Sequence, residues 1–164
     1  MISMMKRRFG RAPIQVPATC TLTEQRIEGT LWQIGEGGFF VELPVIEGLP
    51  DALAVGFELP GHGAHRVVAK PVWRTQSAPR TAPGASRGAG CEFRDVGPTT
   101  RKAIAAYVKK MKQTYSQLQF ALALDRPTPQ LAALLRETRL EELRDRKVLK
   151  EHVAMIVAQM QTAA

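Results

Sequence analysis

The sequence is poor in the residues that build disulfide scaffolds and membrane spans. Only 2 of its 164 residues are cysteine, and Cys20 and Cys91 stand far apart without a CxxC spacing. No stretch approaches the roughly 20 uninterrupted apolar residues of a membrane span. The first residues contain no apolar run of signal-peptide length. These absences exclude a disulfide-rich scaffold and a spanning helix, and we expect a soluble protein of the reducing cytoplasm.

Candidates for catalysis are also missing. An enzyme needs a nucleophile beside a base, paired acids or a set of metal ligands. His62 and His65 share a predicted turn, but no Cys, Asp or Glu stands beside them at metal-ligand spacing. Cys20 and Cys91 fall in the first and last predicted strands, where a thiol is ordinary core filling. We therefore expect no enzymatic activity, no catalytic residue, no metal and no cofactor.

Acidic side chains are in the minority. The net charge of +8 and the pI near 10 point to anionic partners. Residues 1–98 are nearly balanced, with 11 basic and 9 acidic side chains, and their charge is concentrated in four cations between Lys6 and Arg11. Pro13 follows this run and disfavours a helix. We interpret residues 1–12 as a flexible basic lead-in.

Six segments with strand character come next. From Ile14 to Leu22 apolar and polar residues alternate with the period of two of a half-buried strand. Pro71 lacks the amide hydrogen of a ladder, so its strand is expected at an edge or with a bulge. The sequence thus predicts a mainly β domain, a six-stranded antiparallel barrel over residues 13–97. The five further strands are expected at Arg26–Ile34, Gly38–Leu43, Ala54–Leu59, Arg66–Thr75 and Ala89–Asp95.

Two helices are predicted after the barrel. Apolar residues recur at steps of three and four over residues 98–125. Thr128 and Pro129 offer a cap and a first-turn proline for a second helix that runs toward Met160 within the extension 126–164. The last apolar positions of that helix either pack against the preceding helix or form a seam for a homodimer.

The helical part holds most of the excess positive charge. Residues 99–164 contain 12 basic and 6 acidic side chains. The acidic residues are interspersed among the basic ones, which favours paired charges on a solvated helix face over a nucleic-acid interface. We expect no nucleic-acid partner.

Two motifs carry a family resemblance. The run from Arg7 to Pro13 is similar to the RxxxR motif of the PilZ domain, the bacterial receptor domain for cyclic di-GMP. The turn between the second and third strands, Gln-Ile-Gly-Glu-Gly-Gly at residues 33–38, occupies the place of its second motif, Asp/Asn-x-Ser-x-x-Gly. The resemblance covers roughly residues 6–113. It implies a PilZ-type barrel followed by helices.

The resemblance also implies a cyclic di-GMP site. Arginine pairs bidentately with phosphate and stacks on purines, so the arginine motif is expected to hold phosphate and guanine. The glycine turn is expected to receive the guanine edge and a phosphate. The expected ligand-binding residues are Arg7, Arg8 and Arg11 of the first motif and Gln33, Gly35 and Gly38 of the second.

The second motif departs from the family pattern at two positions. Gln33 is one methylene longer than Asn, and Gly35 lacks the hydroxyl of Ser. Two functions stay open. One is a cyclic di-GMP receptor that couples binding to a partner protein. The other is a degenerate barrel that does not bind the nucleotide and acts as an interaction or assembly module through its barrel and C-terminal helices.

Overall fold

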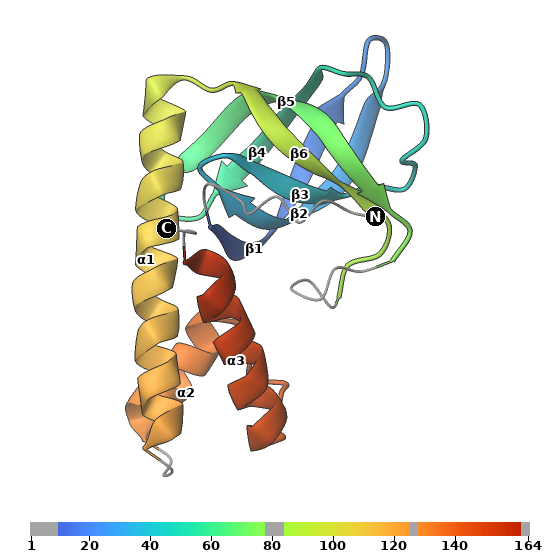
Figure 1. Cartoon of the computed structure of the whole chain (residues 1–164). Coiled ribbons are helices and arrows are strands. Elements are labelled where there is room, and N and C mark those ends of the chain that lie inside the picture. The colour runs from blue at the N-terminus through green and yellow to red at the C-terminus, as the bar shows by residue number, and fades with distance from the viewer. Residues whose placement is uncertain (1–9, 78–83, 125–127, 162–164) are drawn as a thin grey trace.

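The computed structural model describes residues 10–77, 84–124 and 128–161. Its main body is a closed barrel of six antiparallel strands in the order β1-β2-β3-β6-β5-β4 (Figure 1). The predicted six-stranded antiparallel barrel is confirmed. The strands are β1 (Arg11–Thr21), β2 (Arg26–Gly35), β3 (Gly38–Glu42), β4 (Leu53–Leu59), β5 (Gly63–Thr75) and β6 (Gly88–Asp95).

The first strand begins earlier than the alternation predicts. Arg11 and Ala12, which we assigned to the lead-in, already pair with Gly35 and Ile34 of β2. The alternation misses this pairing because a basic residue two positions before a proline does not have the composition of a strand. Arg11 is therefore the first residue of the barrel.

Strand alternation places one face of each strand inside the barrel. Phe39 of β3 and Leu31 of β2 are fully buried there, together with Cys20 and Cys91. Burial raises the pKa of each thiol to about 12. Both cysteines are thus protonated core residues, as expected from their positions in the strands.

Irregular pairing interrupts three strand pairs. The register of β5 against β6 shifts between Pro71 and Trp73, which confirms the bulge expected at the proline. A second shift lies between Leu31 and Gln33 of β2, where β2 pairs with β3, and another lies in the first half of β1. The shift in β2 leaves Gln33 opposite Phe40 and so determines which side chains share a face with it.

Three helices follow the barrel in the described part of the chain. They are α1 (Pro98–Ala123), α2 (Pro129–Glu137) and α3 (Arg146–Met160). The predicted single second helix was wrong, because Arg139 has a left-handed φ of 60° that ends α2. The side chain of Asp145 then accepts hydrogen bonds from Lys147 N and Val148 N and starts a new helix.

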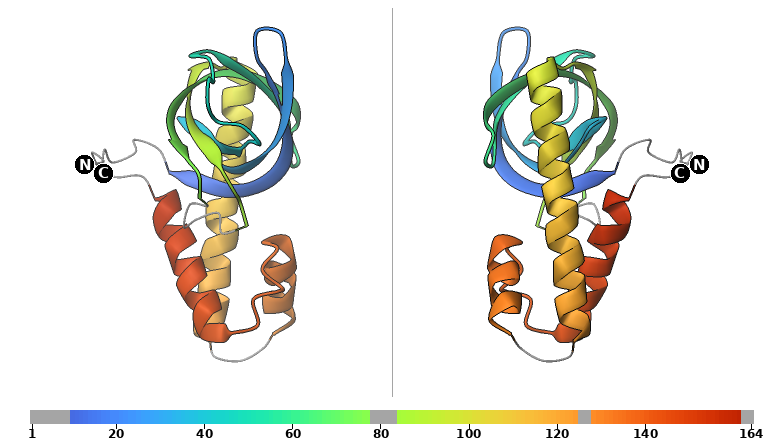
Figure 2. Two further views of the ribbon diagram at one scale, coloured as in Figure 1. Left: turned by 90° about the vertical axis from the view of Figure 1, so that its right-hand side faces the viewer. Right: turned by 90° about the vertical axis from the view of Figure 1, so that its left-hand side faces the viewer.

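The helices form a hairpin-like group on one side of the barrel. Figures 1 and 2 show α1 running along the barrel and beyond it, while α3 returns beside α1 so that its end reaches the start of β1. The guanidinium of Arg146 donates to Leu122 O at 2.8 Å and ties the start of α3 to the end of α1. No helix among the described residues is long and apolar enough to cross a membrane. The apolar stripe of α3 is buried within this arrangement and comprises Leu149, Val153, Ile156 and Met160.

Candidate functional site

The two motifs meet where β1 begins and β2 ends. Because β1 and β2 are antiparallel, the first residue of β1, Arg11, lies directly opposite the last residue of β2, Gly35. Arg7 and Arg8 lie outside the described residues. The structure therefore brings one arginine of the first motif to the glycine turn.

The strand register places Arg11 and Gln33 on the outer face of the barrel. Residues that pair directly across antiparallel strands share a face, and Gln33 pairs with Phe40, which pairs with Gly90, which pairs with Trp73. Arg11 lies two positions along β1 from the partner of Gln33 and therefore shares this face. The neighbouring row points into the core and contains Ile34, Phe39 and Cys91.

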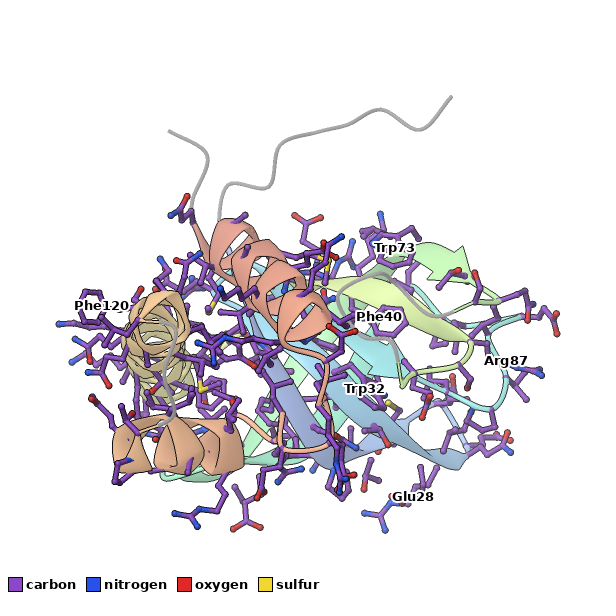
Figure 3. The ribbon with its side chains drawn as sticks, turned by 90° about the horizontal axis from the view of Figure 1, so that it is seen from below. Glu28, Trp32, Phe40, Trp73, Arg87 and Phe120 are labelled. Carbon is purple, nitrogen blue, oxygen red and sulfur yellow. The ribbon has the colours of Figure 1, made fainter. Side chains whose placement is uncertain are left out.

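Two aromatic rings stack on this side of the barrel, where Phe40 is fully buried and Trp73 is 36% exposed. The rings of Phe40 and Trp73 are stacked with centroids 5.5 Å apart and an interplanar angle of 24° (Figure 3). Gly90 lies between them, and a Cβ on Gly90 would collide with the indole of Trp73. Aromatic rings of this kind can stack against a nucleobase. The sequence motifs did not single out this pair, although an aromatic residue in each of two strands and a glycine between them was the available signal.

Gly35 is a steric requirement of the site. A Cβ at this position would collide with the carbonyl oxygen of Gly10. The sequence alone suggests that Gly35 only removes a serine hydroxyl from the family motif. The structure adds that the chain before Arg11 crosses β2 so closely that a side chain at position 35 has no room.

Gly38 has a separate steric role. It pairs with Glu92, and a Cβ on it would collide with the carbonyl oxygen of Cys91. The adjacent carbonyl of Gly37 accepts a hydrogen bond from Phe93 N at 3.0 Å. The end of the glycine turn is thus held against β6 by backbone contacts.

The side chains of Arg11 and Gln33 are covered in this structure. Arg11 is 8% exposed and Gln33 is 1% exposed. The last turn of α3 lies on the same backbone, where Gln159 Nε2 donates to Arg11 O at 2.8 Å. A Cβ on Gly10 would collide with the carbonyl oxygen of Met160. Sequence reasoning missed this contact, because the family resemblance ends near residue 113.

A cavity of about 380 Å³ separates the middle of α3 from the barrel. It lies between β1, α1 and the α2–α3 connection. Burial lowers the pKa of His152, which faces this space. The lining includes Ile14, Trp32, Tyr115, Arg139, His152 and Ile156.

Comparisons with known proteins identify the fold and the family. Residues 5–110 match the PilZ domain family. The inhibitor of motility MotI (DgrA) of Bacillus subtilis is 17% identical over 63% of this chain and 49% of that chain, with a TM-score of 0.50. The PilZ domain of YcgR from Escherichia coli with cyclic di-GMP is 15% identical over 66% and 93% of the two chains, with a TM-score of 0.51.

A longer YcgR chain gives a similar result. Escherichia coli YcgR in complex with cyclic di-GMP is 16% identical over 68% of this chain and 48% of that chain, with a TM-score of 0.53. The match spans about half the length of MotI and of this YcgR chain. A comparison with curated proteins gives no match. At these identities the solved structures establish the fold.

Proposed function

The chain belongs to the PilZ domain family, and from this premise we propose that it is a cyclic di-GMP receptor that couples ligand binding to a partner protein. The observation that carries the proposal is the pairing of Arg11 with Gly35. This pairing puts Arg11 of the first motif beside the glycine turn, as a ligand that contacts both motifs requires. The complex of YcgR, which has the same fold, contains this ligand.

The residues of this face match the chemistry of cyclic di-GMP. The ligand has two phosphates and two guanines, so its binding site requires guanidinium groups and flat apolar surfaces. Arg11, with Arg7 and Arg8 before it in the sequence, supplies guanidinium groups that bind phosphate in charge-assisted pairs. Trp73, which is 36% exposed and stacks on the buried ring of Phe40, supplies a surface for a guanine. We propose a binding function without a chemical step.

Calorimetric titration of the full chain with cyclic di-GMP tests the proposal. With a concentration of about 100 μM protein binding sites, we expect a saturable heat of binding. The variant Arg7→Ala/Arg11→Ala should bind about 100-fold more weakly, because two charge-assisted contacts are removed. Arg26→Ala is the matched control, since Arg26 is an exposed arginine at the opposite end of β2. It should bind like the parent chain. Absence of heat with the parent chain, or an equal loss in the control, would contradict the proposal.

One observation favours the second candidate function, an interaction module that does not bind the nucleotide. Gln33 is almost completely buried, and the motif backbone contacts α3 in this structure. In that case the barrel and the helices form one rigid surface for a partner protein. The same titration separates the two functions, because the interaction module gives no heat with cyclic di-GMP.

A further inference from the structure

The contact between α3 and the arginine motif points to regulation of the proposed site. We propose that the last turn of α3 and cyclic di-GMP compete for the same place on the barrel, so that ligand binding releases this turn. The inference rests on the proposed function and specifies how the bound state differs from the free state. It assigns the end of α3 as the element that reports binding.

The first argument is direct contact. The side chain of Gln159 donates to the backbone carbonyl of Arg11 at 2.8 Å. The carbonyl of Met160 lies so close to Gly10 that only a glycine fits there. In turn, Gly10 lies directly over Gly35. The end of α3 therefore lies against Gly10 and Arg11, where the first motif meets Gly35 of the second.

The second argument is burial. The guanidinium-bearing residue Arg11 is 8% exposed, Gln33 is 1% exposed and Met160 is 1% exposed. A ligand that pairs with Arg11 and Gln33 needs access to their polar atoms. The last turn of α3 lies on Gly10 and Arg11, so it has to move before a dinucleotide can occupy this face.

The third argument is charge. The carbonyl end of a helix carries a partial negative charge, and the last turn of α3 contains no basic side chain to offset it. This end lies against Gly10 and Arg11, where the phosphates of the ligand are also expected. The carbonyl end of α3 and a ligand phosphate are both negative and both favour the position beside Arg11. They exclude each other there, so the coupling between them is negative.

The fourth argument is the way in which α3 is held. Its apolar stripe packs within the helical group, and a cavity of about 380 Å³ separates its middle from β1. The hydrogen bond to Arg11 and the close approach to Gly10 both lie at its last turn. This turn can leave the motif while Leu149 and Val153 stay packed, because the end of a helix can open locally without its middle.

Hydrogen exchange on the full chain, with and without saturating cyclic di-GMP, tests the inference. We expect the amides of residues 157–160 to exchange about tenfold faster or more with ligand, because their helical hydrogen bonds open. The amides of residues 104–118 in α1 should not change. Measured binding heat with unchanged or slower exchange at residues 157–160 overturns the inference and leaves the proposed function standing. Absence of binding heat overturns both.

The coupling is reciprocal, so a weakened contact must favour the ligand. Gln159→Ala removes the hydrogen bond to Arg11 from a partly exposed position, and we expect cyclic di-GMP to bind it about fivefold more tightly. Ala158→Ser is the control in the same turn, since Ala158 is exposed, and its affinity should equal that of the parent chain. An unchanged or weaker affinity of Gln159→Ala contradicts the competition.

Discussion

The barrel and the helical group are held together by different kinds of contact. Every strand of the barrel is hydrogen-bonded to two neighbours in a closed ring. The helices rely on the buried apolar side chains of each helix, on caps such as Asp145 and on a few side-chain bonds to backbone carbonyls. Damage to the ring therefore affects all six strands, whereas α3 can loosen turn by turn. This difference places the rigid scaffold and the movable element of the proposed receptor in separate parts of one chain.

The largest effect is expected in the barrel core. Phe39→Ala removes a fully buried ring and should lower the free energy of unfolding by about 3–5 kcal/mol. The matched control is Phe120→Ala on α1, where the ring is 69% exposed and points away from the chain (Figure 3), so its effect should stay within about 0.5 kcal/mol. Urea unfolding followed by circular dichroism measures both. Similar losses of unfolding free energy in Phe39→Ala and Phe120→Ala would contradict the expected difference between a buried and an exposed ring.

A smaller and more local effect is expected in α3. Ile156→Ala empties a buried position and should cost about 2–4 kcal/mol, with faster hydrogen exchange in α3 but not in β2 or β3. Val148→Ala is the control on the same helix, since Val148 is 46% exposed. If the strands lose protection as much as α3 does, the two parts open as one unit and the comparison fails.

A serine at position 35 tests the place where the barrel meets the end of α3, because Gly35 lies against Gly10 and Gly10 lies against Met160. Gly35→Ser restores the family residue but places a Cβ against the carbonyl of Gly10, and we expect it to lower stability by about 1–3 kcal/mol. Gly56→Ser is the control in β4, because its Cβ would make only an ordinary contact. Thermal unfolding compares them. Equal unfolding temperatures for the two variants would contradict the predicted collision between a Cβ at position 35 and the carbonyl of Gly10.

The smallest effect concerns pH. Burial lowers the pKa of His152 in the folded protein, so the unfolded chain takes up a proton first as the pH falls through the ordinary value of 6.5. Stability should therefore decrease between about pH 7 and pH 5, and His152→Gln should reduce this slope. The charged groups that line the same cavity are Lys110, Glu137 and Arg139. An identical slope in both proteins assigns the pH dependence to other groups.

The strands could be predicted closely because their alternation directly reflects one buried and one exposed face. Pro71 added a bulge that the structure contains. The start of β1 was missed, since Arg11 and Pro13 pair through the backbone and do not resemble a strand in composition. The local sequence pattern was thus sufficient to predict the six strands of the barrel but not the first residues of β1.

The helical group was harder to predict. The break between α2 and α3 depends on the left-handed backbone of Arg139, which has no distinctive sequence signal. The cover on the arginine motif depends on a bond between residues 148 positions apart, Gln159 and Arg11. Periodicity identifies the apolar stripe of α3, but it does not determine which surface the end of that helix reaches.

The closed order of strands also limits how a partner protein can attach. Since each strand already has a neighbour on both sides, the sheet offers no whole free edge to which a foreign strand could be added. Recognition by addition of a partner β-strand to the sheet is thereby disfavoured. A partner must read side chains, and its specificity then depends on the few surface positions that the ring itself does not constrain.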